Sequence, residues 1–277
     1  MVAVALGLTA SLAWGTADFL GGLKSRTLNL LAVLVASQAV ALILLAAATG
    51  IRGDGPPAAG GLALAALAGA GGVLGLAAFY RGLAIGAMAV VAPIGGLGAV
   101  LPVAVGVATG ERPGALAVAG IALALAGVVL SSREEGDGGT RMAAGVGLAL
   151  LAALGFGTFL TAMDAAGDGD VLCALLMARC ASVALLGVAV AIARPALGEL
   201  RGHEGAVLAI GVLDMAANGL FALAATEGLV SVVAVLSSLY PVVTILLARA
   251  VLGERVRASQ QLGVALVLVG VVGIALG

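Results

Sequence analysis

Apolar residues fill most of the chain in long stretches, and short runs rich in Gly, Pro or charge interrupt them. A helix that spans a lipid bilayer needs roughly 20 apolar residues, and the interruptions leave ten such stretches. Their approximate bounds are 2–22, 28–50, 60–80, 86–108, 114–131, 143–163, 171–193, 205–226, 230–251 and 259–276. None alternates with the period of two typical of a transmembrane β-strand. The pattern therefore predicts an all-α polytopic membrane protein with ten transmembrane helices.

Composition supports this prediction and excludes several classes of function. Hydrophobic residues make up 62% of the chain and charged residues 10%, with a mean hydropathy of +1.25, whereas about a quarter of the residues in a soluble domain are charged. The net charge of −1 leaves no basic surface for nucleic acid, and the single His leaves no imidazole cluster for a metal. An enzyme should show His, Cys or paired acids near one interface, and none is visible. We expect no enzyme activity, no metal and no cofactor.

The longest polar stretch, "SSREEGDGGTR" at 131–141, lies at the midpoint and separates two similar halves. With a shift of 140, "GLTASLAWGTADFL" overlays "GLALLAALGFGTFL", and a shift of 143 aligns identical residues from Gly110 to Val129 with those from Gly253 to Val272. We expect a first repeat over 1–131, a linker over 132–141 and a second repeat over 142–277. Because each repeat has an odd number of helices, the second enters the bilayer with the opposite orientation, which predicts two inverted five-helix repeats.

The charges of the loops agree with an inverted repeat. The loop after the first segment carries Lys24 and Arg26, whereas its counterpart in the second half carries Asp164, Asp168 and Asp170 and no base. Basic residues concentrate on the side of that first loop, and basic loops favour the cytoplasmic side. We therefore expect both termini outside the cytoplasm, in a multi-pass protein of the cell (inner) membrane.

Ionisable residues inside the apolar segments are the main chemical signal, because each must face protein or a water-filled cavity. Asp214 lies near the middle of its segment, with Asn218 one turn away, and forms either a substrate or proton site or a helix-packing cluster. Arg179 lies deep enough to need a partner. Its depth matches that of Asp214, which favours an ion pair, and the alternative is that it reaches Asp168 or Asp170.

Trp14 and Asp18 are spaced i, i+4 in the first segment, so an aromatic wall and a carboxylate face the same way. Asp18 is a second candidate for the substrate or proton site, or reaches the interface beside Lys24. Its position matches Thr158 in the second half, so the acid is not shared by the repeats. Tyr80, next to Arg81, is a further candidate for substrate contact or an aromatic interface anchor.

Pro241 interrupts the ninth segment and removes a backbone hydrogen bond, so Ser237 and Tyr240 beside it line a substrate site or flank a packing kink. Glu111 and Glu254 lie in short turns, where we expect them to bond the free amides of the next helix. Gly273 and Gly277 are spaced for a small-residue face that serves packing or a homodimer.

Several spaced stretches resemble the two EamA repeats of the drug/metabolite transporter superfamily. They are "AVLSSLYPVVTILLARAVLGERVRASQQLGVALVLVGVVGIAL" and "VVAPIGGLGAVLPVAVGVATGERPGALAVAGIALALAGVVL", together with "WGTADFLGG" and "FYRGLAIGAM", which are similar to the first helix and to the turn between helices 3 and 4. Two positions depart from symmetry: Gly98 occupies the slot of Pro241, and Gln38 stands where the second half has Arg179.

The resemblance implies a secondary carrier with a central cavity that moves small metabolites, amino acids or drugs, often outward. The expected solute lies between helices 1, 3, 4, 6, 8 and 9, and Asp214 or Asp18 takes up a proton. The alternatives are a lipid-linked sugar flippase of the same superfamily, a channel, or a non-transport membrane subunit. A flippase would show a groove open to lipid, and a channel would show repeated pore-lining rings.

Overall fold

The computed structural model describes residues 2–52, 59–110, 114–131, 139–166, 171–227, 233, 236–237, 239–255 and 257–276, and every regular element in them is helical. The α-helices are α1 (Val2–Lys24), α2 (Leu30–Arg52), α3 (Ala59–Ile85), α4 (Met88–Gly95), α5 (Val100–Ala108), α6 (Ala115–Ser131), α7 (Gly139–Ala166), α8 (Val171–Ala193), α9 (Glu204–Glu227), α11 (Tyr240–Leu252) and α12 (Ala258–Leu276). Two short 3-10 helices, η1 (Gly96–Ala99) and η2 (Leu197–Leu200), complete this set.

Each of the ten apolar segments contains one helical span in the described residues. Eight of these spans are long and apolar enough to cross a membrane, and Ala115–Leu130 and Tyr240–Leu252 are shorter. The expected all-α class is therefore confirmed. The fourth segment differs from expectation, because its span consists of α4, η1 and α5 rather than one regular helix. The change to 3-10 geometry falls on the Gly-rich "GLGA" of η1, which lies between Pro93 and Pro102.

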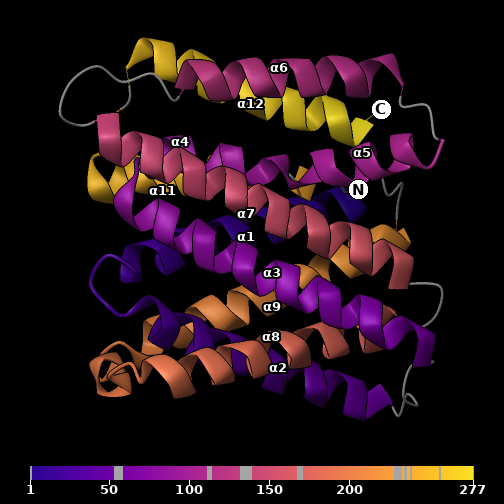
Figure 1. Cartoon of the computed structure of the whole chain (residues 1–277), viewed down its shortest axis with the longest axis vertical. Coiled ribbons are helices and arrows are strands. Elements are labelled where there is room, and N and C mark those ends of the chain that lie inside the picture. The colour runs from indigo at the N-terminus through magenta and orange to yellow at the C-terminus, as the bar shows by residue number, and fades with distance from the viewer. Residues whose placement is uncertain are drawn as a thin grey trace.

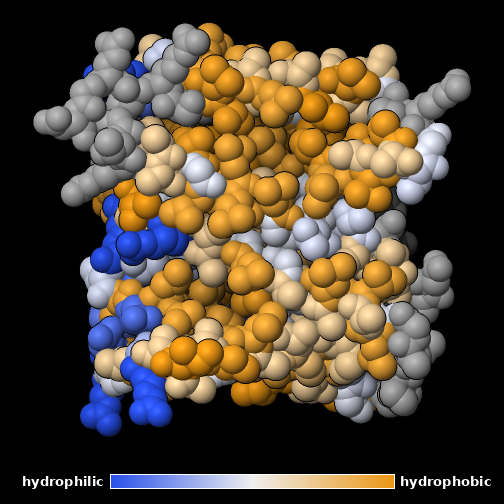
Figure 2. Space-filling view, viewed as in Figure 1, coloured by the Kyte–Doolittle hydropathy of each residue, from blue (hydrophilic) through white to orange (hydrophobic). Residues whose placement is uncertain are grey.

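The helices lie side by side, with α6 and α12 at one edge of the bundle and α2 and α8 at the other (Figure 1). The main contacts join α3 to α7 and α8, α1 to α9 and α11, and α6 to α12. All of these pair a helix that precedes residue 132 with one that follows residue 138, so the two parts of the chain interlock. Hydrophilic residues gather at the end of the bundle opposite the termini, and apolar residues cover the middle (Figure 2).

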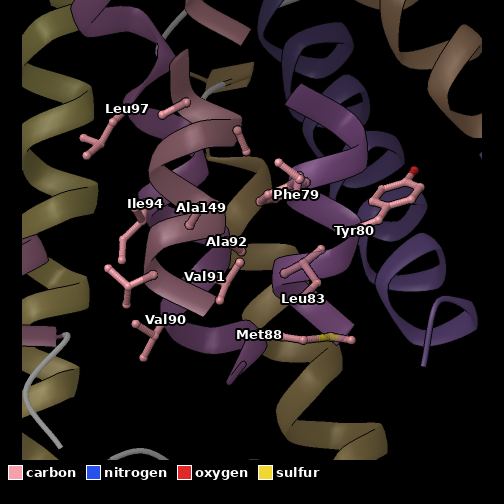
Figure 3. Packing of buried hydrophobic residues seen from close by; sticks show 14 of the residues in the cluster. Phe79, Tyr80, Leu83, Met88, Val90, Val91, Ala92, Ile94, Leu97 and Ala149 are labelled. Atoms are coloured by element: carbon pink, nitrogen blue, oxygen red, sulfur yellow. The ribbon is translucent and has the colours of Figure 1, made fainter. Parts of the chain in front are cut away.

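The buried core lies between α3, α4 and α7. Phe79 of α3 is fully buried and meets Phe156 of α7 edge to face, with ring centroids 5.5 Å apart. Val91 and Ile94 of α4 complete this cluster on the same side of α3 (Figure 3). Because α4 is buried along its whole length, the fourth span serves as the centre of the packing.

Glycine allows close helix contacts, including those between α6 and α12. A Cβ at Gly120 would lie 2.7 Å from the carbonyl oxygen of Gly270, and one at Gly127 would lie 2.6 Å from that of Gly263. Small residues allow such backbone approach inside a membrane, where burial of apolar surface does not drive helices together. Gly273 also faces α6, since its Cβ would lie 3.1 Å from the Cα of Gly120.

The expected small-residue face of Gly273 is thus used within the chain. Gly277 lies outside the described residues, and the homodimer stays a prediction. Pro241 likewise has a role in the fold, because α11 begins at Tyr240 and places Pro241 in its first turn. A proline there removes an amide that no carbonyl of α11 would have bonded, so Pro241 fits the start of α11.

Candidate functional site

Arg179 is the centre of a polar group that links three helices. From α8, its Nη1 donates a hydrogen bond to Oε1 of Gln38 on α2, and its Nη2 lies 3.1 Å from Oδ2 of Asp214 on α9. The side chains of Arg179 and Asp214 are 13% and 22% exposed, and Gln38 is buried. The structure therefore places Arg179 in an ion pair with Asp214, as the matched depths favoured. Asp168 and Asp170, the alternative partners, lie outside the described residues.

Gln38 was noted in the sequence only as the residue that stands where the second half has Arg179. The two residues are 141 positions apart, close to the shift that aligns the halves, and they bond to each other. In the sequence alignment of the two halves, Gln38 and Arg179 occupy equivalent positions. That equivalence was the signal from which this contact could have been found.

Trp14 and Asp18 belong to α1, which packs against α9, the helix of Asp214. The ring centroid of Trp14 lies 5.9 Å from that of Phe221 on α9, and Ala3, near the start of α1, packs close to Ala224. The two helices therefore run antiparallel, so that the next turn of α1, with Asp18, approaches the turn of α9 that carries Asp214. Asp18 is partly exposed.

The glycines of "WGTADFLGG" explain how other helices come close to Asp18. A Cβ at Gly15 would lie 2.5 Å from Cβ of Val243, and Oγ1 of Thr244 donates a 3.1 Å hydrogen bond to the Gly15 carbonyl, so α11 packs directly on α1. At Gly21, the missing side chain leaves room for the ring of Tyr80.

Tyr80 is 2% exposed and points from α3 toward α1, away from the Phe79 cluster (Figure 3). It is therefore buried against α1, while its neighbour Arg81 is exposed. An interface anchor would instead leave the aromatic ring at the surface. The Tyr80 ring packs on α1 at Gly21, and the backbone of Tyr240 packs on the same helix at Gly15.

Asn218 and Ser237, two further candidate residues, differ in their hydrogen bonding. Nδ2 of Asn218 donates a 2.7 Å hydrogen bond to the carbonyl of Asp214 in its own helix, and the side chain remains partly exposed. The Ser237 hydroxyl is buried and has no hydrogen-bond partner in the described part of the chain. An unsatisfied buried hydroxyl costs free energy, so Ser237 offers a polar contact to a ligand or a water molecule.

Glu254 lies at the charged end of the bundle. Its Oε2 accepts a 3.3 Å hydrogen bond from the amide of Ala89 at the start of α4, and its Oε1 lies 2.9 Å from Nη2 of Arg26. The sequence predicted a contact with the helix that follows the turn, whereas the structure shows a cap on α4, a helix distant in sequence. Glu111 lies outside the described residues.

A pocket of about 500 Å³ lies beside Glu254, between the start of α4, the end of α11 and α12. None of the candidate substrate residues lines it. Arg249 and Arg255 do, so this pocket belongs to the charged end of the bundle and not to the group around Arg179. Among the described residues, no three His, Cys, Asp or Glu side chains come together as a metal site would require.

Arg179 thus joins the two parts of an interlocked apolar helix bundle. In a comparison with known families, residues 1–133 and 143–276 each match the EamA-like transporter family. The chain therefore belongs to the EamA-like transporter family, within the drug/metabolite transporter superfamily, and is a multi-pass membrane protein. The resemblance seen in the sequence is confirmed.

A crystal structure of another protein has a similar fold. It aligns over 99% of this chain and 96% of its own length, with a TM-score of 0.64 and 21% sequence identity. At that identity the likeness shows the shared fold alone. No curated protein sequence matches the chain significantly.

Proposed function

We propose that the protein is a secondary transporter that exports a small organic solute, such as a metabolite, an amino acid or a drug, across the inner membrane. The observation that carries this proposal is the contact of Arg179 with Gln38 and Asp214. It holds the only described ion pair buried within the spans at a place where the two halves meet, and intramembrane charges mark solute pathways.

Two inverted five-helix halves account for the way the helices pack. If α1, α2, α3 and α4 correspond to α7, α8, α9 and α11, each principal contact has a counterpart. Thus the contact of α1 with α9 corresponds to that of α7 with α3. The contact of α1 with α11 corresponds to that of α7 with α4. This exchange supports a two-fold relation. The hydrophilic end of the bundle lies opposite both termini, which favours termini outside the cytoplasm (Figures 1 and 2).

In the proposed mechanism, the two halves rock against each other and expose a central site to one side of the membrane at a time. The solute contacts the candidate residues on the helices around Arg179, namely Trp14, Asp18, Tyr80, Asp214, Asn218, Ser237 and Tyr240. Asp214 or Asp18 takes up a proton as the site changes sides. Because Arg179 bonds to both halves, their relative motion must break or replace one of its two contacts.

The test compares the metabolites that accumulate in the medium of cells producing the wild type, Asp214→Asn and Glu204→Gln. Glu204 is the matched control, because it lies on the same helix α9 and is exposed in its first turn. We expect Asp214→Asn to lose the export that the wild type confers and Glu204→Gln to keep it, at equal amounts of protein in the membrane. Unchanged export of every compound by Asp214→Asn would contradict the mechanism. A change confined to lipid-linked sugars would favour a flippase.

A further inference from the structure

The charges of the central group do not balance. Asp18, Asp214 and Arg179 are the charged residues in the apolar parts of α1, α9 and α8, which gives two potential negative charges and one positive charge. The guanidinium is already engaged, since it bonds to Gln38 and Asp214. Asp18 has no ion pair and no hydrogen bond within the described residues. A carboxylate inside a membrane protein needs a partner, and the part of the chain that the structure describes offers none to Asp18.

The surroundings of Asp18 suit a cation. Trp14, one turn earlier on the same face of α1, stands against Phe221, and both rings are partly exposed rather than buried. The ring of Tyr80 packs on α1 at Gly21 and the backbone of Tyr240 packs on it at Gly15, on either side of Asp18 along the helix. Aromatic faces attract a positively charged nitrogen, and a carboxylate beside them adds a charge-assisted hydrogen bond. A neutral solute would gain neither of these two interactions.

We infer that the transported solute carries a protonated amine, which pairs with Asp18 between Trp14 and the two tyrosines, and that it carries no carboxylate of its own. This inference rests on the proposed function and narrows its substrate class to organic cations. The expectation that the solute carries no carboxylate follows from the pairing of Arg179. A zwitterion such as an amino acid would need a free cation for its carboxylate, and Asp214 already occupies Arg179.

The protein carries its own reporter for this test, because Trp14 is its only Trp and lies one turn from Asp18. Binding to the purified protein is followed by Trp14 fluorescence with three probes of similar shape: phenethylamine, 2-phenylethanol and phenylalanine. They present an amine, a neutral hydroxyl, and an amine with a carboxylate. We expect saturable binding of phenethylamine at a concentration about tenfold or more below that of the other two, because ionic hydrogen bonds exceed neutral ones in strength.

Two variants assign the preference to Asp18. Asp18→Asn should bind phenethylamine and 2-phenylethanol equally, and Asp18→Glu should restore the preference for the amine because it keeps the charge. Equal or tighter binding of 2-phenylethanol or phenylalanine to the wild type would overturn the inference, as would an unchanged preference in Asp18→Asn. The elution profile of each variant in size-exclusion chromatography establishes that it is folded.

The export comparison described above supplies a second measurement that does not depend on the choice of probes. Compounds exported by the wild type should carry a protonated amine and no carboxylate, and their export should fall in Asp18→Asn. Export of neutral or acidic compounds only would overturn the inference while leaving the transporter proposal intact. Amine binding at Asp18 without any export would contradict the transporter proposal and leave the amine site intact.

Discussion

Removing Arg179 should reveal how strongly the central group depends on it. In Arg179→Met, Asp214 loses its only described ion partner and Oε1 of Gln38 loses its donor. Breaking a buried ion pair by deleting one partner costs about 3 to 5 kcal/mol, because the remaining charge stays desolvated. The Asp214 side chain is 22% exposed, so water reaches it in part and the low end applies. We expect a loss of about 3 kcal/mol, close to a hundredfold change in the folding equilibrium.

The same substitution should cost much less once Asp214 is neutral. In an Asp214→Asn background, Arg179→Met leaves no charge unpaired, and we expect a loss below about 1.5 kcal/mol, which corresponds to a coupling of about 1.5 kcal/mol or more between the two residues. The four proteins of this cycle are unfolded by sodium dodecyl sulfate in mixed micelles, with Trp14 fluorescence as the signal. The control is Arg249→Met, which removes an exposed arginine and should change stability by less than about 0.5 kcal/mol.

Additive losses in this cycle, within about 0.5 kcal/mol, would refute the reasoning. They would mean that Arg179 and Asp214 do not stabilise each other in the membrane protein, despite the 3.1 Å contact. An Arg249→Met loss as large as that of Arg179→Met would equally show that the effect does not come from burial of the ion pair.

Three further predictions concern helix packing, the charged end and the topology. Gly120→Ala should destabilise the protein by about 1 to 3 kcal/mol in thermal unfolding, because the added Cβ would lie 2.7 Å from a backbone oxygen of α12; Gly147→Ala, which meets nothing within 4 Å, should not, and equal effects would contradict the packing argument. Glu254→Gln should lower stability by about 0.5 to 1 kcal/mol through the loss of charge opposite Arg26, and an effect that persists undiminished at high salt would point to another cause. A cysteine at Lys24, in a chain without its two native cysteines, should react with an impermeant maleimide only after the cells are opened, and labelling of intact cells would reverse the proposed orientation.

The helices could be predicted because the membrane makes their signal local. A stretch of roughly 20 apolar residues has few other stable states in lipid, and all ten stretches contain a helical span. The 3-10 turn at Gly96–Ala99 could not be predicted in the same way, since the segment around it is uniformly apolar and the change depends on packing against α7. Likewise, Pro241 has the same sequence signature whether it bends a helix or begins one.

The candidate site was predictable where depth alone decides a contact. Arg179 and Asp214 lie at similar depths on helices of the same half, and that sufficed to favour their pairing. The Gln38 contact depends on where the halves meet, and the Glu254 contact with α4 depends on how a turn of one half lies over a helix of the other. Both are contacts between residues more than 140 positions apart, which no local pattern specifies.

The bond between Gln38 and Arg179 also bears on why two repeats occupy one chain. If the proposed two-fold axis relates the halves, a dimer of identical five-helix subunits would carry the same residue at both positions: either two arginines that repel each other or two glutamines without charge. A fused chain can mutate one copy and keep the other. Here that freedom allows a single guanidinium to be held by an uncharged amide from one side and a carboxylate from the other, an arrangement that no symmetric ancestor could encode.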